Sequence, residues 1–121
     1  MKALYSAALL IAALATGPAW GACTYPTAPG TMPDGNTATR DEMVAAKKQV
    51  TEFDKLITAY TECLKLENDS ALAQSAELSA DQKKEMTRML DQKHNAAVEA
   101  AESVATRFNE QLKVFNAKSK K

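Results

Sequence analysis

The placement of glycine and proline constrains the fold of this chain more than any other feature. All four glycines and all four prolines precede Asn36, so the stretch from Asn36 to Lys121 contains neither residue. That stretch is rich in Ala, Glu, Lys, Gln and Leu, which favour helix, and it lacks the strongest helix breakers. It therefore predicts an all-α fold, and it leaves no place for a glycine-rich phosphate loop or a strand-turn-helix nucleophile elbow.

The first predicted helix covers residues 39–67 and carries a continuous apolar seam. Thr39 and Glu42 form a capping box at its start. Apolar residues then recur at alternating steps of three and four, which is the heptad pattern of coiled coils. The seam consists of Met43, Ala46, Val50, Phe53, Ile57, Tyr60 and Leu64. The polar run 67–70 is the predicted interruption, although residues 71–78 remain compatible with helix.

The second predicted helix covers residues 80–117 and begins at another capping box, formed by Ser79 and Gln82. Its apolar face consists of Met86, Leu90, Ala97, Ala101, Val104, Phe108, Leu112 and Phe115. Folding the chain into an antiparallel hairpin sets Phe53 roughly opposite Ala97, so large side chains meet small ones.

The second helix is the longer one, so its last apolar residues are predicted to extend beyond the first helix. Phe108, Leu112 and Phe115 are the candidate interaction surface, covered either by the turn at residues 31–36 or by a second molecule. A two-helix hairpin has a thin core, so a disulfide, a packed arm or a homodimer is expected to stabilise it.

Residues 1–21 have the pattern of a secretory signal peptide. Lys2 is followed by an apolar run over residues 3–15 and by a helix break, and cleavage is predicted after Gly21. The chain is therefore predicted to be periplasmic or secreted. A second interpretation is a lipoprotein signal, since Gly and Ala precede Cys23, although Trp stands where Leu is usual. Lipidation of Cys23 would attach the protein to a membrane.

Residues 22–38 are punctuated by Pro26, Pro29 and Pro33, and each proline favours an extended conformation in the residue before it. The segment Pro33-Asp34-Gly35 is typical of a β-turn. We predict an extended arm that turns and enters the hairpin, residues 39–121. The alternative is a disordered N-terminus of the mature chain.

Cys23 and Cys63 are the only cysteines, and in an oxidising compartment such a pair usually forms a disulfide. The bridge would close a loop of about 41 residues, for which the chain-entropy model gives at most about 4 kcal/mol of stabilisation. The helix rises roughly 36 Å from Thr39 to Cys63, and an extended arm spans roughly 50 Å. The arm can therefore run back along the first helix, where Tyr25, Pro26, Pro29 and Met32 would cover apolar surface. The alternative is a pair of free thiols.

Residues that could carry chemistry are sparse. His94 is the only histidine and falls at a seam position of the second helix, and Met86 and Met89 are predicted to fill the core instead of binding a soft metal. Acidic pairs alternate with lysines, as on a solvated face. Catalytic and metal-binding motifs such as H-E-x-x-H, G-x-S-x-G and C-x-x-C-H are absent. We therefore predict no enzyme activity, no cofactor and no metal. Lysine plus arginine and aspartate plus glutamate both number 15, which predicts no nucleic-acid binding.

With the arm and both helices in view, the chain resembles a group of small exported bacterial helical-hairpin proteins for which no activity is known. The resemblance rests on Cys23, on the spaced prolines that lead to Pro33-Asp34-Gly35, on Glu42-Met43, on Tyr60-x-x-Cys63-Leu64 and on Phe108-Asn109-Glu110-Gln111. The segment Leu78-Ser79-Ala80-Asp81-Gln82-Lys83 is similar to the L-T-x-x-Q signature of Spy-type periplasmic chaperones, and the C-terminal lysine is similar to that of Braun-type murein lipoproteins.

The sequence therefore predicts an exported, disulfide-clamped helical protein that acts by binding a protein, including a second copy of itself, and not by catalysis. A periplasmic chaperone or stress-response binder that uses the apolar face of the second helix is one alternative. An envelope lipoprotein with a structural role is the other.

Overall fold

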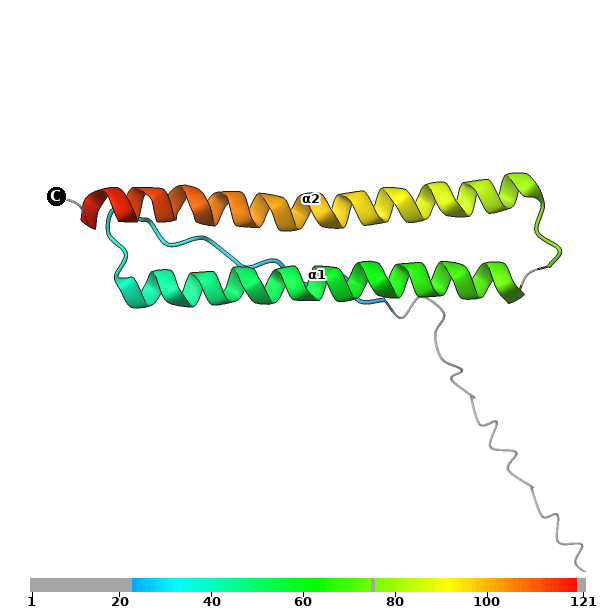
Figure 1. The fold of residues 1–121 in the computed structure, drawn as a ribbon, viewed down its shortest axis with the longest axis horizontal. Coiled ribbons are helices and arrows are strands. Elements are labelled where there is room, and N and C mark those ends of the chain that lie inside the picture. The colour runs from blue at the N-terminus through cyan, green and yellow to red at the C-terminus, as the bar shows by residue number, and fades with distance from the viewer. Residues whose placement is uncertain (1–22, 75, 120–121) are drawn as a thin grey trace, which may run out of the picture.

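The computed structural model describes residues 23–74 and 76–119, which form two long helices and an extended arm. Helix α1 spans Arg40–Gln74 and helix α2 spans Ala80–Ser119. The helices lie side by side and antiparallel (Figure 1). We call the end with the α1–α2 connection the tip, and the opposite end the open end. The predicted all-α helical hairpin is confirmed, and the predicted signal peptide, residues 1–21, lies outside the described residues.

Helix α1 continues to Gln74, so the predicted end near residue 67 is wrong. The polar run 67–70 contains no glycine or proline, and residues such as Asn and Asp cost only about 0.7 kcal/mol each in a helix. The residues that follow, Ala71, Leu72 and Ala73, favour helix again. Ser70 Oγ also accepts a hydrogen bond from Gln74 Nε2 at 3.3 Å. A short polar run therefore passes through the helix without ending it.

Both helices begin at the predicted capping boxes. The Thr39 N–H donates to Glu42 Oε2 at 2.8 Å, and the Glu42 N–H donates to Thr39 Oγ1 at 3.2 Å. The same reciprocal pair recurs before α2, where the Ser79 N–H donates to Gln82 Oε1 at 2.9 Å and the Gln82 N–H to Ser79 Oγ at 3.1 Å. Each box satisfies backbone donors that have no partner within the helix.

The core lies between the open end and the middle of the hairpin, in two clusters of buried side chains. The cluster at the open end contains Ala38, Met43, Ala46 and Phe108. The central cluster contains Phe53, Ile57, Ala97 and Val104, so the predicted meeting of Phe53 with Ala97 is confirmed. Ala97 is completely buried, which leaves no room for a larger side chain opposite the phenylalanine ring.

The arm forms a third layer along one face of the hairpin, which we call the arm face (Figure 1). At its start the predicted disulfide joins Cys23 to Cys63, with 5.7 Å between the Cα atoms. The ring of Tyr25 meets that of Tyr60 edge to face, with 5.1 Å between the ring centroids. Further along, Met32 packs against both core clusters. The arm therefore covers apolar surface from Cys63 to the open end, as expected.

The arm ends in a turn that is fastened to the C-terminal part of α2. Asp34 O accepts hydrogen bonds from the N–H groups of Thr37 at 3.1 Å and Ala38 at 2.8 Å. The Gly35 N–H donates to Gln111 Oε1 of α2 at 2.8 Å. Lys118 Nζ, which also belongs to α2, donates to Asn36 O at 3.0 Å. The arm is therefore held at both of its ends.

Candidate functional site: the arm face of the hairpin

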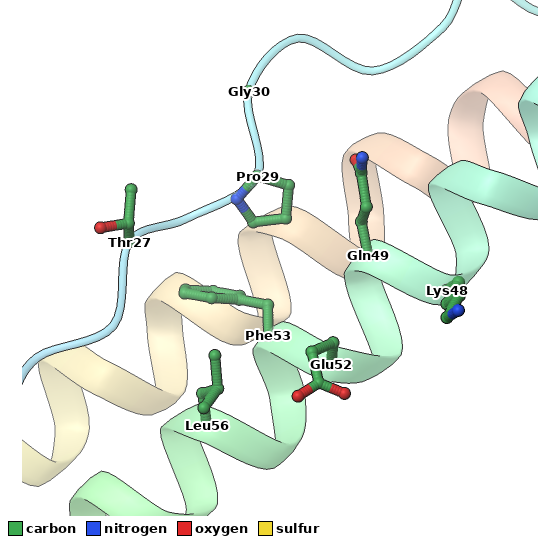
Figure 2. A pocket seen from close by; sticks show the side chains of 8 residues that line it. All are labelled: Thr27, Pro29, Gly30, Lys48, Gln49, Glu52, Phe53 and Leu56. Carbon is green, nitrogen blue, oxygen red and sulfur yellow. The ribbon is translucent and has the colours of Figure 1, made fainter.

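Between the arm and α1 lies a groove of about 400 Å³ (Figure 2). Its lining residues are Thr27, Pro29 and Gly30 of the arm, and Lys48, Gln49, Glu52, Phe53 and Leu56 of α1. The buried ring of Phe53 extends from α1 toward the arm, below Pro29 (Figure 2). Leu56 is 45% exposed. The lining has an apolar floor with one cation and one carboxylate beside it, and it contains no histidine, cysteine or carboxylate pair, so it suits binding better than acid–base chemistry.

A second groove, which we call the distal groove, lies between α1 and α2 nearer the tip and has a volume of about 230 Å³. It is lined by Leu64, Glu67, Asn68, Ala71, Met86, Met89, Leu90 and Lys93. On the α1 side it begins at the disulfide, because a carboxylate oxygen of Glu67 lies within 4.8 Å of the sulfurs of Cys23 and Cys63.

The α2 side of the distal groove also belongs to the arm face. Lys93 lines the groove, and Gln111 binds the turn of the arm at Gly35. These two residues of α2 are 18 positions apart (111 − 93), which is about five turns at 3.6 residues per turn, so they lie on the same side of the helix. The distal groove therefore continues the surface that the arm covers, beyond the point at which the arm is attached.

The part of the hairpin near the tip has no buried side chain among its described residues. The last buried residue of α1 is Leu64 and the first of α2 is Ala97. Between them, Leu66 is 69% exposed and Met89 is 47% exposed. Apolar residues such as Ala71, Met86 and Leu90 line this part, but none of them is buried.

The surface predicted from the sequence at the end of α2 lies against the arm. Phe108 is buried in the open-end cluster, and Leu112 and Phe115 are partly buried against it. The backbone at Gly35 lies close to Gln111, Val114 and Phe115. The turn therefore covers much of this apolar surface, which was one of the two expected arrangements. Binding of a second molecule to Phe108, Leu112 and Phe115 stays a prediction.

Two residues with potential chemistry are more exposed than expected. His94, which has a seam spacing in the sequence, is exposed, and the seam residues on either side of it are Leu90 and Ala97. Met89 is exposed as well and does not fill the core, whereas Met86 is partly buried. Core filling was predicted for both methionines from the residue type, which does not reveal where along a hairpin the core ends.

The described titratable groups include one close exposed ion pair, between Glu85 and Arg88 of α2. Arg88 Nε donates to Glu85 Oε2 at 2.9 Å. The hydrogen bond with Arg88 lowers the pKa of the Glu85 carboxyl, and the same bond raises the pKa of the guanidinium. Both groups are fully exposed, one turn apart on a helix, so the pair is an ordinary surface interaction.

Cys23, Cys63 and Glu67 bring three potential metal-ligand atoms together. The two sulfurs are bonded to each other, so neither is available as a thiolate ligand. The disulfide argues against the lipoprotein interpretation, because Sγ of Cys23 cannot form both a disulfide and a thioether to a lipid. Within the described part of the chain, neither helix is long and apolar enough to cross a membrane.

Comparisons with protein-family models, with curated proteins and with solved structures found no match, so function has to be argued from this chain's own residues. The distal groove was not predicted from the sequence. The available signal was the pair of cysteines. Because Cys63 precedes the end of the first helix, the arm attached there cannot cover the rest of that helix.

Proposed function

We propose that this protein is exported and acts by binding other proteins through the arm face near its tip, with the disulfide-clamped half of the hairpin as a rigid support. The observation that carries the proposal is the contrast between the two halves. All nine buried hydrophobic residues of the described part of the chain lie before residue 65 or after residue 96, while Met89, which lines the distal groove between them, is 47% exposed.

The physical basis is that a pair of helices without a buried core is poorly stabilised. Most helix stability in proteins comes from packing of an apolar face, not from intrinsic propensity. Near the tip that face is present, in residues such as Ala71, Met86 and Leu90, and it is only partly covered. Exposed apolar surface of this kind marks interaction sites.

Export is supported by the leader pattern of residues 1–21 and by the disulfide between Cys23 and Cys63, since disulfides persist in oxidising compartments. Binding in preference to catalysis is supported by the side chains themselves. No polar or charged side chain is buried within residues 23–74 and 76–119, so these residues provide no desolvated acid, base or nucleophile.

Site-specific photo-crosslinking in the exported protein tests the proposal. A photoreactive amino acid in place of Met89 is expected to form covalent adducts with protein, while the same amino acid in place of Asn95, an exposed residue elsewhere around α2, forms none. Light scattering of the purified chain separates self-association from binding to another protein. Equal labelling at the two positions, or none at either, would contradict the proposal.

A chaperone function is the second candidate, and the exposure of Leu66 and Met89 favours it because unfolded clients are recognised through apolar contacts. It predicts that the protein delays the aggregation of an unrelated unfolded client in proportion to its concentration. Met89→Glu should reduce this effect, whereas Asn95→Glu should not. An excess of protein that leaves the aggregation unchanged would remove this candidate.

A further inference from the structure

We propose that the distal groove binds an extended peptide segment of a partner protein, which continues the path of the arm beyond Cys63 toward the tip. This inference rests on the proposed function and names the kind of partner. The occupant is an extended chain with bulky apolar side chains, resembling the arm in its chemistry. The way the arm packs on the same face indicates how an extended chain binds there. The size of the groove indicates what fits into it, and the length of the arm indicates that the occupant comes from another polypeptide.

The arm shows how this face of the hairpin binds an extended chain. Its contacts with the helices are largely made by side chains: Tyr25 on Tyr60, buried Pro26, and Met32 against both core clusters. Hydrogen bonds from the arm backbone to the helices are concentrated at the terminal turn, at Gly35 and Asn36. A segment bound farther along would likewise be recognised by its side chains, while its backbone stays solvated.

The size of the distal groove fits side chains better than a whole small molecule. Its volume is about 230 Å³, which exceeds the roughly 150 Å³ of an apolar cavity that accepts benzene. It is smaller than the roughly 300–1,000 Å³ of typical small-molecule sites. One ring or one methionine-sized side chain therefore fits between Met86, Met89 and Leu90. A helix, about 10 Å across, does not fit into it.

The protein's own arm cannot fill the distal groove. From Cys23 to Asp34 the extended arm covers about 34 Å (11 residues at 3.1 Å). The rise of α1 from Thr39 to Cys63 is about 36 Å. The arm is therefore already fully stretched between its two attachments. With cleavage after Gly21, Ala22 alone would precede the disulfide, so the occupant has to come from another polypeptide.

The test uses the oxidised mature protein with isotope-labelled methionine methyl groups, and a synthetic peptide of the arm sequence Thr24–Asp34 as the probe. This peptide is known from the structure to have side chains that suit this face. Saturable shifts are expected for the methyl groups of Met86 and Met89. The methyl groups of Met43, which is buried, and of Met32, which lies in the protein's own arm, should not move.

Met89→Glu is expected to weaken peptide binding at least tenfold, and the matched variant Asn95→Glu less than twofold. A control peptide in which tyrosine and methionine are both replaced by serine should cause no shift. Circular dichroism of the two variants verifies that both remain helical, and a Met89→Gln variant provides the same readout if the glutamate variant does not fold.

Three results would overturn the inference. Absence of any shift at millimolar peptide excludes the site, and a shift of Met32 shows exchange with the protein's own arm instead. Shifts of Met86 and Met89 that depend on protein concentration without peptide identify a second copy as the occupant. In each case photo-crosslinking at Met89 remains informative: adducts there without peptide binding would leave the proposed function standing and remove only the peptide groove.

Discussion

Replacement of Gly35 by alanine should destabilise the protein strongly, because the turn of the arm leaves no space for a methyl group. A Cβ atom at this position would lie 2.2 Å from Gln111 O, 2.9 Å from Phe115 N and 2.9 Å from Val114 Cβ. Two of these three atoms belong to the backbone of α2 and cannot rotate away. The requirement for glycine here is therefore one of space, set by a helix that lies far along the sequence.

The size of the effect follows from the displacement that the methyl group forces. Raising the shortest contact from 2.2 Å to an ordinary separation moves the turn by roughly 1 Å, and overpacking of this kind costs about 1–3 kcal/mol. The same movement weakens the hydrogen bond from the Gly35 N–H to Gln111 Oε1, which is 2.8 Å long and contributes on the order of 1 kcal/mol. We expect a total loss of about 2–4 kcal/mol, which is a large share of the stability of a small domain.

Urea denaturation followed by circular dichroism measures this loss, with Gly30→Ala as the matched control. A Cβ at Gly30 would meet no heavy atom within 4 Å, so this change should be neutral or stabilise by up to about 1 kcal/mol through the unfolded chain. The midpoint should fall for Gly35→Ala with little change in the slope of the transition. If the two variants differ by less than about 0.5 kcal/mol, the close packing of the turn on α2 is not a feature of the protein in solution.

Four further outcomes are expected. Replacing both cysteines by serine should cost up to about 4 kcal/mol in free energy of unfolding, and a mature protein in which both thiols react with a thiol reagent without denaturant would contradict the disulfide. Thr39→Ala should cost about 1 kcal/mol, measured by denaturation, because it removes half of a capping box, and restoring stability with serine would verify the cause. Ala97→Leu should cost about 1–3 kcal/mol, since Ala97 is fully buried, and an equally stable variant would show that the helices separate easily there. The pKa of Glu85, followed by NMR, should rise toward its ordinary value in Arg88→Ala. The ion pair stabilises the fold at pH values above the ordinary carboxyl pKa, and this stabilisation is lost as the pH falls through the lowered pKa. A titration of Glu85 that is the same in both proteins would mean that the pair does not persist in solution.

The parts of the fold that could be predicted from the sequence are those determined by local or periodic signals. The capping boxes at Thr39 and Ser79 mark helix starts through contacts three residues apart. The seam predicts a partner helix, and an isolated pair of cysteines predicts a bond. The meeting of Phe53 with Ala97 also follows, because a hairpin of two regular helices has few possible registers.

The parts that could not be predicted depend on contacts between distant residues, or on where an apolar pattern extends beyond the buried core. The sequence predicts Gly35 only as a turn residue, whereas its closest neighbours belong to α2, at Gln111 and beyond. The sequence predicts an interruption at the polar run 67–70, yet helix propensities differ too little there to end α1. Met86 and Leu90 hold seam positions in a part of α2 that has no buried residue, and periodicity alone does not distinguish a covered from an uncovered seam.

The division of the hairpin at the disulfide has a consequence for how a peptide would bind in the distal groove. At the Cys63 end the groove starts next to Leu64, which is buried, and next to a covalent link, so its walls are already fixed before binding. Toward the tip, Ala71 and Met86 are only partly covered, and a bound side chain would supply packing that these residues lack on their own. Ordering the ends of α1 and α2 at the tip would then offset part of the free energy of contact, which lowers the affinity for a given contact area. Selectivity should accordingly be greatest for the peptide side chain that enters next to Leu64 and Leu90, while peptide positions nearer the tip tolerate variation. Such a groove is better suited to binding many related segments weakly than to binding a single partner tightly.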